Sequence, residues 1–467
     1  MGPLVLFGLD VGSTTCHAVA AVAQVRSRCI SGRMELCGGE LCYRSQPVFT
    51  PFVGDDLDID ALAGLIDGWL AEAGLTPTQL AGGGAIVTGL AANTAQAPAV
   101  RRLVHERISA GLVATTQDPH LESWLAFFGS CAALCQADPE RLFLNLDIGG
   151  GTSNLALGRG DTVLLTDVLQ VGARHLRFVP GSYRLIAASP VGGQRLASLG
   201  IEDAIGRELS PTEVTALCRS FVAELEERVV LHTDQPGRRE AVVVFSGGVG
   251  ELIYQASHYQ ASGRPASPPV APADPLPPSL APTAFGDLGG ELAAHILASP
   301  ILARDVHSTR PQMLGRATVC GLALHNVEVS GSTLYLPDPS LLPLADLPVV
   351  ATLPYTATDA ELAAAFALAR RAATGACIAL CGMPTASAVA LGQRLRPFLP
   401  AADAPPVVVI LEGNGGKTLG NYATDWGTRP GRLIVLDEIR VPAAQFVTLG
   451  RRRHTVVPLS FYGRSRL

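Results

Sequence analysis

Two short stretches decide the fold: DVGSTT at residues 10–15 and DIGGGT at residues 147–152. Each consists of an aspartate, a β-branched residue, a glycine, two small residues and a threonine. An apolar run precedes each stretch, at residues 4–9 and 142–146, and a second apolar run follows it. This pattern predicts two tight β-hairpins, each with a small, hydroxyl-rich tip.

The predicted hairpin tips have the composition of a phosphate site. Glycine lets the backbone approach a ligand closely. Successive N–H groups at such a tip form a concave anion site, to which serine and threonine hydroxyls add donors. Phosphate contacts are therefore expected from Gly12, Ser13, Thr14, Thr15, Gly149, Gly150, Gly151 and Thr152. Asp10 and Asp147 stand at the hairpin entrances, where phosphate would repel them unless a cation lies between. Both are expected to position a hydrated Mg²⁺.

A third glycine-rich turn, SGGVGE at residues 246–251, directly follows an apolar run at residues 241–245. A dinucleotide fingerprint would need a glycine at position 253, where Ile253 stands. A strand that ends in Ser-Gly-Gly at a helix start instead suits contact with adenosine and phosphate. We expect Glu251 to contact the ribose. The expected border of the nucleoside is formed by Ser246, Gly247, Gly248 and Gly250.

Alternating strand-like and helical segments predict an α/β protein. Examples are the valine-rich run at residues 407–411 and the helical stretch at residues 211–231. Eight prolines between residues 255 and 282 break the alternation, so we expect a flexible insertion at 255–282. The expected division is a first lobe at 1–141, a second lobe at 142–329 that contains the insertion, and a C-terminal α/β domain at 330–467.

The composition excludes several classes of protein. The chain has 467 residues, 48% of them hydrophobic, and a net charge of −6. An acidic balance without a basic stripe argues against a nucleic-acid partner. No apolar run approaches the ~20 residues of a membrane helix, and the run at residues 4–7 is too short for a secretory signal. We expect a cytoplasmic protein with no membrane partner. The ten cysteines show no zinc-like spacing.

The order of the three turns resembles the ATPase superfamily of actin, sugar kinases and heat-shock chaperones. Residues 110–129 and 313–321 look like the two connecting segments of that superfamily, with small residues where two helices must cross closely. The resemblance implies an actin-like ATPase fold, with two duplicated ribonuclease-H-like lobes around a nucleotide cleft. ATP and Mg²⁺ are the implied ligands.

Two acidic residues near the first connecting segment are rivals for orienting the attacking water. The resemblance places Asp118 where the chaperones carry an acidic residue. Its alternative role is to cap a helix that begins at Pro119. Glu122 lies one helical turn further on and is the rival base, although a first-turn acid also stabilises a helix by itself.

Longer stretches point to one family within the superfamily. They are PHLES at 119–123, NLDIGGGT at 145–152, SGGVGE at 246–251, RATV at 316–319, SGST at 330–333 and VVPLS at 456–460. These stretches resemble the reactivating factor of ethanolamine ammonia-lyase. The resemblance runs from about residue 8 to the C-terminus, apart from the proline-rich insertion.

That resemblance implies an ATP-dependent chaperone. Its client is the adenosylcobalamin-dependent lyase, with large and small subunits, that splits ethanolamine into acetaldehyde and ammonia. The chaperone is expected to loosen a lyase whose cofactor has lost its adenosyl group, so that intact cofactor replaces the damaged one. Adenosylcobalamin belongs only to the client. Association with a bacterial microcompartment is a further expectation.

Some features depart from this pattern or leave alternatives open. The family often has an acidic residue after Thr88-Gly89, where Leu90 stands, and neither hairpin has a nearby lysine. Both departures bear on hydrolysis more than on binding. A small-molecule kinase of the same superfamily and a non-catalytic structural nucleotide-binding protein stay open, as does the oligomeric state.

The segment GGKT at residues 415–418 looks like the end of a Walker A loop. That motif requires a glycine at position 411, where Leu411 stands. Lys417 therefore marks either a second anion site or a glycine-rich helix start.

Overall fold

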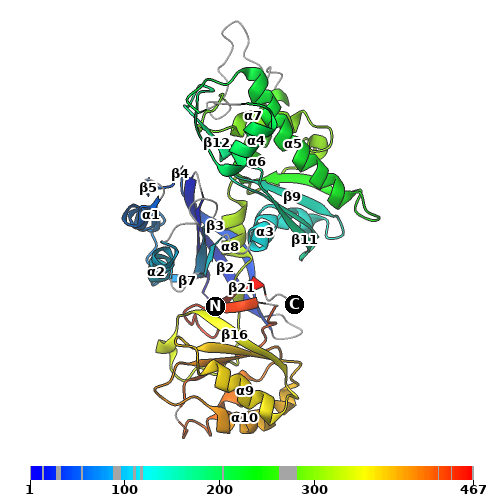
Figure 1. The fold of residues 1–467 in the computed structure, drawn as a ribbon. Helices are drawn as coiled ribbons and strands as arrows, with labels where there is room; N and C mark the ends of the chain where they lie inside the picture. Colours follow the sequence, from blue (N-terminus) through cyan, green and yellow to red (C-terminus); the bar gives the residue numbers. More distant parts are fainter. Residues whose placement is uncertain are drawn as a thin grey trace.

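The computed structural model describes residues 2–12, 15–27, 33–53, 56–87, 96–108, 112–115, 119–201, 205–261, 281–429, 431–442 and 444–464. Three large sheets organise these residues. Figure 1 shows the sheets of the first and second lobes above and a third sheet, formed by the C-terminal part of the chain, below. The expected α/β class is confirmed.

The first sheet has the strand order β3-β2-β1-β7-β8. Its strands are β1 (Leu4–Val11), β2 (Thr15–Ser27), β3 (Met34–Arg44), β7 (Leu80–Val87) and β8 (Leu112–Thr115). The first three strands are antiparallel, whereas β7 and β8 run parallel to β1. The parallel strands are reached through α1 (Ile59–Glu72) and α2 (Ala97–Arg107). Helix α1 starts where the Asp58 side chain accepts a hydrogen bond from the Ala61 N–H.

The second sheet repeats this plan, with the order β11-β10-β9-β14. Its strands are β9 (Phe143–Ile148), β10 (Ser153–Arg159), β11 (Thr162–Leu169) and β14 (Val242–Ser246). Three antiparallel strands again precede a parallel one, reached through α5 (Pro211–Thr233). The duplicated lobes expected from the two hairpin motifs are therefore present.

Apolar strand sequences account for the core of the second lobe. Strands β9 and β14 are buried at every position, because helices cover both faces of the sheet. One face packs on α3 (Pro119–Ala137), and α6 (Gly247–Ala261) contacts β9 and β14. The smaller elements are β4 (Val48–Phe49), β5 (Phe52–Val53), β6 (Asp56–Leu57), β12 (Leu176–Phe178), β13 (Leu185–Ala188), α4 (Pro190–Ser198) and α7 (Gly289–Leu297).

Two connecting helices cross between the lobes, α3 and α8 (Ala317–Leu324). A side chain at Gly129 would collide with the Ala317 carbonyl, and one at Gly321 would collide with the Leu125 carbonyl. Glycine is therefore required for this close approach. Helix α3 packs on the second sheet, and α8 packs on β1, β2 and β7 of the first. The division at residues 141 and 329 stays a proposal, since each helix packs across it.

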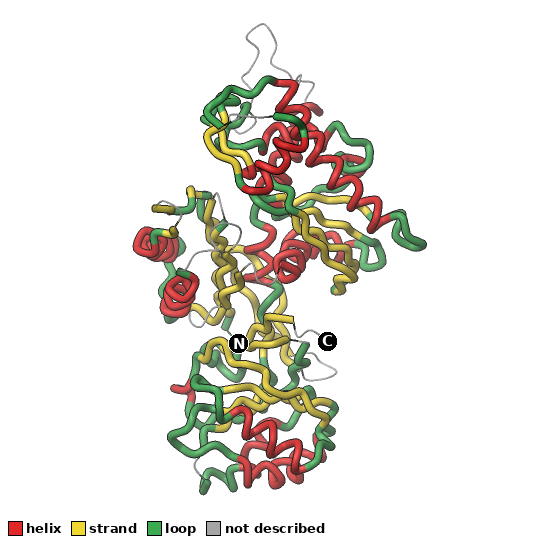
Figure 2. The backbone as a smooth tube through the Cα atoms, viewed as in Figure 1, coloured by secondary structure: helices red, strands yellow, loops and turns green. Residues whose placement is uncertain are grey.

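The third sheet has seven strands in the order β15-β21-β20-β16-β17-β18-β19. They are β15 (Glu328–Val329), β16 (Leu344–Pro354), β17 (Ala376–Cys381), β18 (Val407–Leu411), β19 (Leu433–Leu436), β20 (Ala444–Leu449) and β21 (Pro458–Arg464). Strands β16 to β19 are parallel and alternate with α9 (Asp359–Ala369), α10 (Ala388–Leu395) and α11 (Gly416–Ala423). Figure 2 shows these helices packed below the strands.

The start of the proline-rich insertion differs from the prediction. Helix α6 continues to Ala261, so residues 255–261 are helical rather than part of an insertion at 255–282. The reason is local, because the first proline of the segment is Pro265 and the residues before it are compatible with a helix. Residues 262–280 lie outside the described residues. Across the part of the chain that the structure describes, no helix combines the length and apolarity of a membrane span.

Candidate functional site

A cleft of about 360 Å³ between the two lobes collects most residues singled out in the sequence. The predicted residues that line it are Asp10, Gly12, Thr15, Glu122, Asp147, Gly149, Gly150, Gly151, Thr152, Gly247, Gly248 and Glu251. Ser246 and Gly250 are buried and are not among the lining residues. Ser13, Thr14 and Asp118 lie outside the described residues.

Both hairpins are closed by an equivalent backbone hydrogen bond. In the first, the Gly12 N–H donates to the Thr15 carbonyl at 3.0 Å. In the second, the Gly149 N–H donates to the Thr152 carbonyl, also at 3.0 Å. The shared sequence plan therefore produces the same closing hydrogen bond twice, on opposite sides of the cleft.

Carbonyl groups of both tips are engaged by the protein. The Gly12 carbonyl accepts from Thr50 Oγ1 at 2.7 Å. The Gly149 carbonyl accepts from the Ala173 N–H at 3.1 Å. Carbonyl oxygens repel phosphate, so holding them in protein contacts suits a site that presents N–H groups to an anion.

The strand register places a polar residue opposite each hairpin aspartate. Asp10 on β1 pairs with His17 on β2, and Asp147 on β9 pairs with Asn154 on β10. Both partners line the cleft. Each stands seven positions after its aspartate, and this repeated spacing is the sequence signal for both residues.

Three carboxyl groups share the polar end of the cleft. Burial, followed by the charge of Asp147, raises the pKa of Asp10 to about 7. Burial, followed by Asp147 and Asp10, raises the pKa of Glu122 to about 8. Burial also raises the pKa of Asp147 to about 6, although the Ser246 and Thr318 hydroxyls oppose this shift. The site concentrates negative charge, and a cation would favour the ionised forms.

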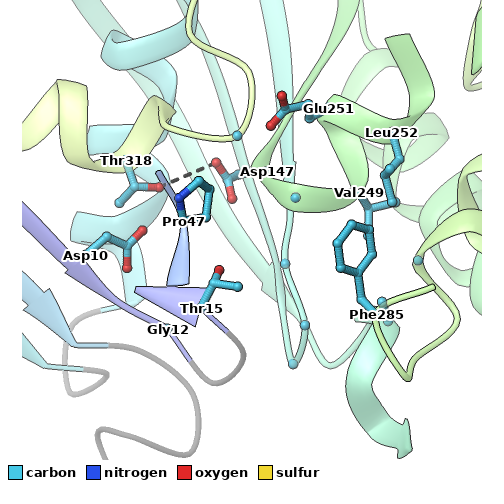
Figure 3. Close-up of a pocket in the computed structure, with 18 of the residues that line it drawn as sticks. Asp10, Gly12, Thr15, Pro47, Asp147, Val249, Glu251, Leu252, Phe285 and Thr318 are labelled. Atoms are coloured by element: carbon cyan, nitrogen blue, oxygen red, sulfur yellow. Dashed lines mark hydrogen bonds between the residues drawn. The ribbon is translucent and has the colours of Figure 1, made fainter. Parts of the chain in front are cut away.

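Hydroxyl groups from two other elements orient Asp147. Ser246 Oγ, at the end of β14, donates to Asp147 Oδ2 at 2.8 Å, and in turn accepts from Asn145 Nδ2 at 2.9 Å. Thr318 on α8 donates to the same carboxylate oxygen at 3.5 Å, as Figure 3 shows. From the sequence, Ser246 is expected to border the nucleoside. In the structure it is buried behind the cleft lining and holds Asp147 instead.

Helix α6 begins at the glycine-rich turn and forms another wall of the cleft. Gly247 has a φ of 81°, and its N–H donates to the Leu314 carbonyl at 3.0 Å. A side chain there would collide with the Ile148 carbonyl, so only glycine lets the third turn pack behind the second hairpin. Glu251 lies beside Gly315 at the edge of the cleft.

The far end of the cleft is apolar. Val249, Leu252 and Phe285 lie together there, away from Asp10 and Asp147 (Figure 3). Phe285 is 40% exposed, and its ring is of the kind on which a planar base stacks. A cleft with a polar, glycine-lined end and an aromatic end suits a ligand that joins phosphates to a planar base.

A cation at the polar end would need ligands from outside the protein. Among the described residues, no three side chains of the His, Cys, Asp and Glu types lie close enough to hold a metal by themselves. Mg²⁺ commonly keeps several waters and takes phosphate oxygens alongside one or two carboxylates. Asp10 and Asp147 fit that limited share of the coordination.

The Walker-like segment of the third sheet is arranged differently. The N–H groups of Gly415 and Gly416 donate to Asp437 Oδ2 at 3.0 and 2.8 Å. The protein's own carboxylate thus occupies the anion position at this helix start. Of the two interpretations of the Lys417 segment, this geometry favours the glycine-rich helix start.

A comparison with protein families identifies the chain. The model of the family described as "Ethanolamine utilisation protein EutA" matches residues 3–461. The chain belongs to the EutA family. The family resemblance found in the sequence is confirmed.

Two relatives match over nearly their whole length. The ethanolamine ammonia-lyase reactivases EutA of Salmonella typhimurium and Escherichia coli are each 29% identical to this chain, covering 96% of it and 95% of their own lengths. Among solved structures, the Aquifex aeolicus Ppx/GppA phosphatase shows 15% identity and a TM-score of 0.32, over 58% of this chain and 73% of its own. The protein EutJ from Carboxydothermus hydrogenoformans shows 14% identity and a TM-score of 0.29, over 69% and 90%.

Proposed function

We propose that this chain is an ATP-dependent reactivating chaperone for ethanolamine ammonia-lyase. The observation that carries the proposal is the full-length match to relatives named as reactivases of that lyase. The cleft between the duplicated lobes supplies a nucleotide site through which such a chaperone can be driven. The lyase, with its large and small subunits, is the proposed partner, and adenosylcobalamin is bound by the lyase alone.

ATP has one favourable orientation in the cleft. Its phosphates lie between the two glycine-rich tips, and its adenine lies against Val249, Leu252 and Phe285. Asp10 and Asp147 would hold Mg²⁺ together with its waters, and the ion would supply positive charge between the carboxylates and the phosphates. Glu251 is the proposed ribose contact.

Hydrolysis requires a group that orients the attacking water. Glu122 lines the cleft at the start of α3, and Asn154 hydrogen-bonds to it. With a pKa of about 8, its carboxyl is largely protonated at neutral pH and is a poor base. A cation nearby lowers that pKa and favours the carboxylate. Glu122 is therefore the proposed water-positioning residue among those described. Asp118 stays its rival from the sequence.

The connecting helices link the nucleotide site to lobe movement. Asp147 is held by Thr318 on α8, and α8 packs against α3 and the first sheet. A change of charge at Asp147 on phosphate release would thus alter its hydrogen bond with Thr318, and through α8 the crossing of the two helices. Lobe rearrangement then alters the grip on the lyase, because a ligand shifts an equilibrium only by its differential affinity for the two states.

A cytoplasmic location, with association to a bacterial microcompartment, belongs to the same proposal. It rests on the proposed client.

Phosphate release from Mg·ATP tests the proposal directly. Release is expected to accelerate when lyase carrying damaged cobalamin is added, and Asp147→Ala is expected to abolish the acceleration. Equal release with and without lyase would contradict the chaperone function. ATP consumption that requires a small-molecule acceptor instead of the lyase would identify a kinase.

A further inference from the structure

His17 is a buried polar residue without a partner. It lies on β2 with 5% exposure, and neither ring nitrogen has a hydrogen-bond partner among the described residues. Its Nε2 is 3.9 Å from Asp10 Oδ2, too far for a hydrogen bond. Leaving buried polar atoms unpaired destabilises a fold, so such a group in a native structure calls for an explanation.

The position of His17 in the cleft offers an explanation for its unpaired nitrogens. The residue lines the cleft and lies on the second strand of the first phosphate hairpin, opposite Asp10. Burial, followed by the charge of Arg316, lowers the pKa of His17 to about 4. Neutral imidazole carries one N–H donor and one acceptor, and the protonated form carries two donors. In either state the ring carries at least one N–H donor.

The second hairpin repeats the feature with different chemistry. Asn154, the register counterpart of His17, is 2% exposed, and its Oδ1 has no hydrogen-bond partner among the described residues. It also lines the cleft. Unpaired polar atoms at equivalent positions of both hairpins indicate a shared ligand rather than an isolated packing defect.

We propose that His17 donates a hydrogen bond to the phosphate chain of the nucleotide bound in the cleft. The inference rests on the proposed function and adds a residue to its site. Phosphate oxygens only accept hydrogen bonds, so an imidazole N–H is a suitable partner for them. The Asn154 amide oxygen is itself an acceptor and suits a water molecule beside the same phosphates.

Two substitutions separate the hydrogen bond from the space that the ring fills. His17→Leu keeps a similar volume and removes both nitrogens, whereas His17→Gln retains a donor and an acceptor. We expect His17→Leu to weaken binding of Mg·ATP and of inorganic tripolyphosphate about tenfold by calorimetry, the effect of a lost charge-assisted hydrogen bond. His17→Gln should stay within about threefold of wild type on the same scale.

A stability measurement separates ligand contact from a structural role. The nucleotide-free His17→Leu protein is expected to melt at the wild-type temperature or above it, because two unpaired buried atoms are gone. His325→Leu is the matched control. His325 lies at the end of α8 with its ring 5.6 Å from that of Phe128, outside the cleft lining, and its loss should leave both ligands' affinities unchanged.

The outcomes discriminate between the two proposals. If His17→Leu binds both ligands as wild type does, or melts lower with unchanged affinities, the His17 contact is wrong while the proposed function stands. If wild type binds tripolyphosphate but not ATP, and His17→Leu weakens that binding, the contact stands while the proposed function fails. Wild type binding neither ligand would overturn both.

Discussion

Glu122 shows how a single side chain links the stability of the empty protein to pH. In the unfolded chain this carboxyl ionises near its ordinary pKa of 4.5, but in the fold it stays protonated until about pH 8. Between pH 4.5 and about pH 8, the folded state therefore keeps a proton on Glu122 that the unfolded state has lost. The stability of the fold falls as the pH rises through that range. Below pH 4 both states are protonated, and the penalty vanishes.

Substituting Glu122 removes this penalty. Glu122→Gln is expected to be more stabilising at pH 8 than at pH 4 by at least about 1.4 kcal/mol, the equivalent of one pKa unit. Denaturant unfolding of the nucleotide-free protein at both pH values measures the difference. If the difference in unfolding free energy between Glu122→Gln and wild type were the same at both pH values, Glu122 would not be held in its neutral form.

Asp10 is expected to act through the metal. Asp10→Ala should weaken Mg·ATP binding at least about tenfold, the loss of one charge-assisted contact. Its melting temperature at neutral pH should be no lower than that of wild type, because burial of the Asp10 carboxyl, which raises its pKa to about 7, penalises the fold. Chelation of Mg²⁺ should weaken ATP binding to wild type but change little in the variant. Calorimetry with and without a chelator makes the comparison, and an equal chelator effect in both proteins would argue against a metal role.

The sequence predicts the residues of the cleft unevenly. Asp10, Asp147 and the hairpin glycines belong to a repeated local motif, so their shared position follows from the turn. His17 and Asn154 face the cleft because of strand register, which a turn motif does not specify. Phe285 reaches the cleft by tertiary packing from a segment far along the chain.

At the scale of elements, the crossing of α3 and α8 depends on glycine. Gly129→Ala is expected to destabilise the protein by about 3 kcal/mol or more, because the added methyl overlaps the Ala317 carbonyl. Gly64→Ala in α1 is the matched control, since its methyl meets nothing within 4 Å. That substitution should stabilise by about 0.5–1 kcal/mol through helix propensity. Similar unfolding free energies for the two variants would contradict the close crossing.

The end of α6 sets the limit of a tolerated deletion. Replacing residues 262–279 with a short Gly/Ser linker is expected to change stability by less than about 1 kcal/mol, since loop length costs only ~0.6 kcal/mol per doubling. Extending the deletion to residue 255 removes buried Ser257 and its contact with His307, and should destabilise markedly. Thermal unfolding of both deletions tests this. Loss of ATP binding in the shorter deletion would assign the insertion a functional role.

The alternation of apolar runs with helical stretches predicts most elements correctly. The error at residues 255–261 has a compositional cause, because the segment shares Ser and Ala with the insertion but contains no proline. The packing of α3 and α8 each on the other lobe's sheet depends on contacts between distant segments. No local pattern encodes it.

At the scale of the whole molecule, the proposed function couples the nucleotide cleft to the opening of the lyase. The cleft lies between duplicated lobes, and the crossing helices contact both. When the nucleotide changes the arrangement of the lobes, the protein can therefore present two different surfaces to the lyase in turn. Repeated exchange of cofactor requires such a cycle, because binding alone would leave the partner in one state.

Multiple-turnover rescue of ethanolamine ammonia-lyase tests the central claim most directly. Lyase inactivated by damaged cobalamin is incubated with substoichiometric chain, ATP, Mg²⁺ and fresh adenosylcobalamin, and ethanolamine cleavage is followed. The account predicts recovery that exceeds one lyase per chain and stops when any one component is omitted, with Asp147→Ala giving no repeated rescue. Failure of wild type on a matched lyase, or full rescue by Asp147→Ala, would contradict it.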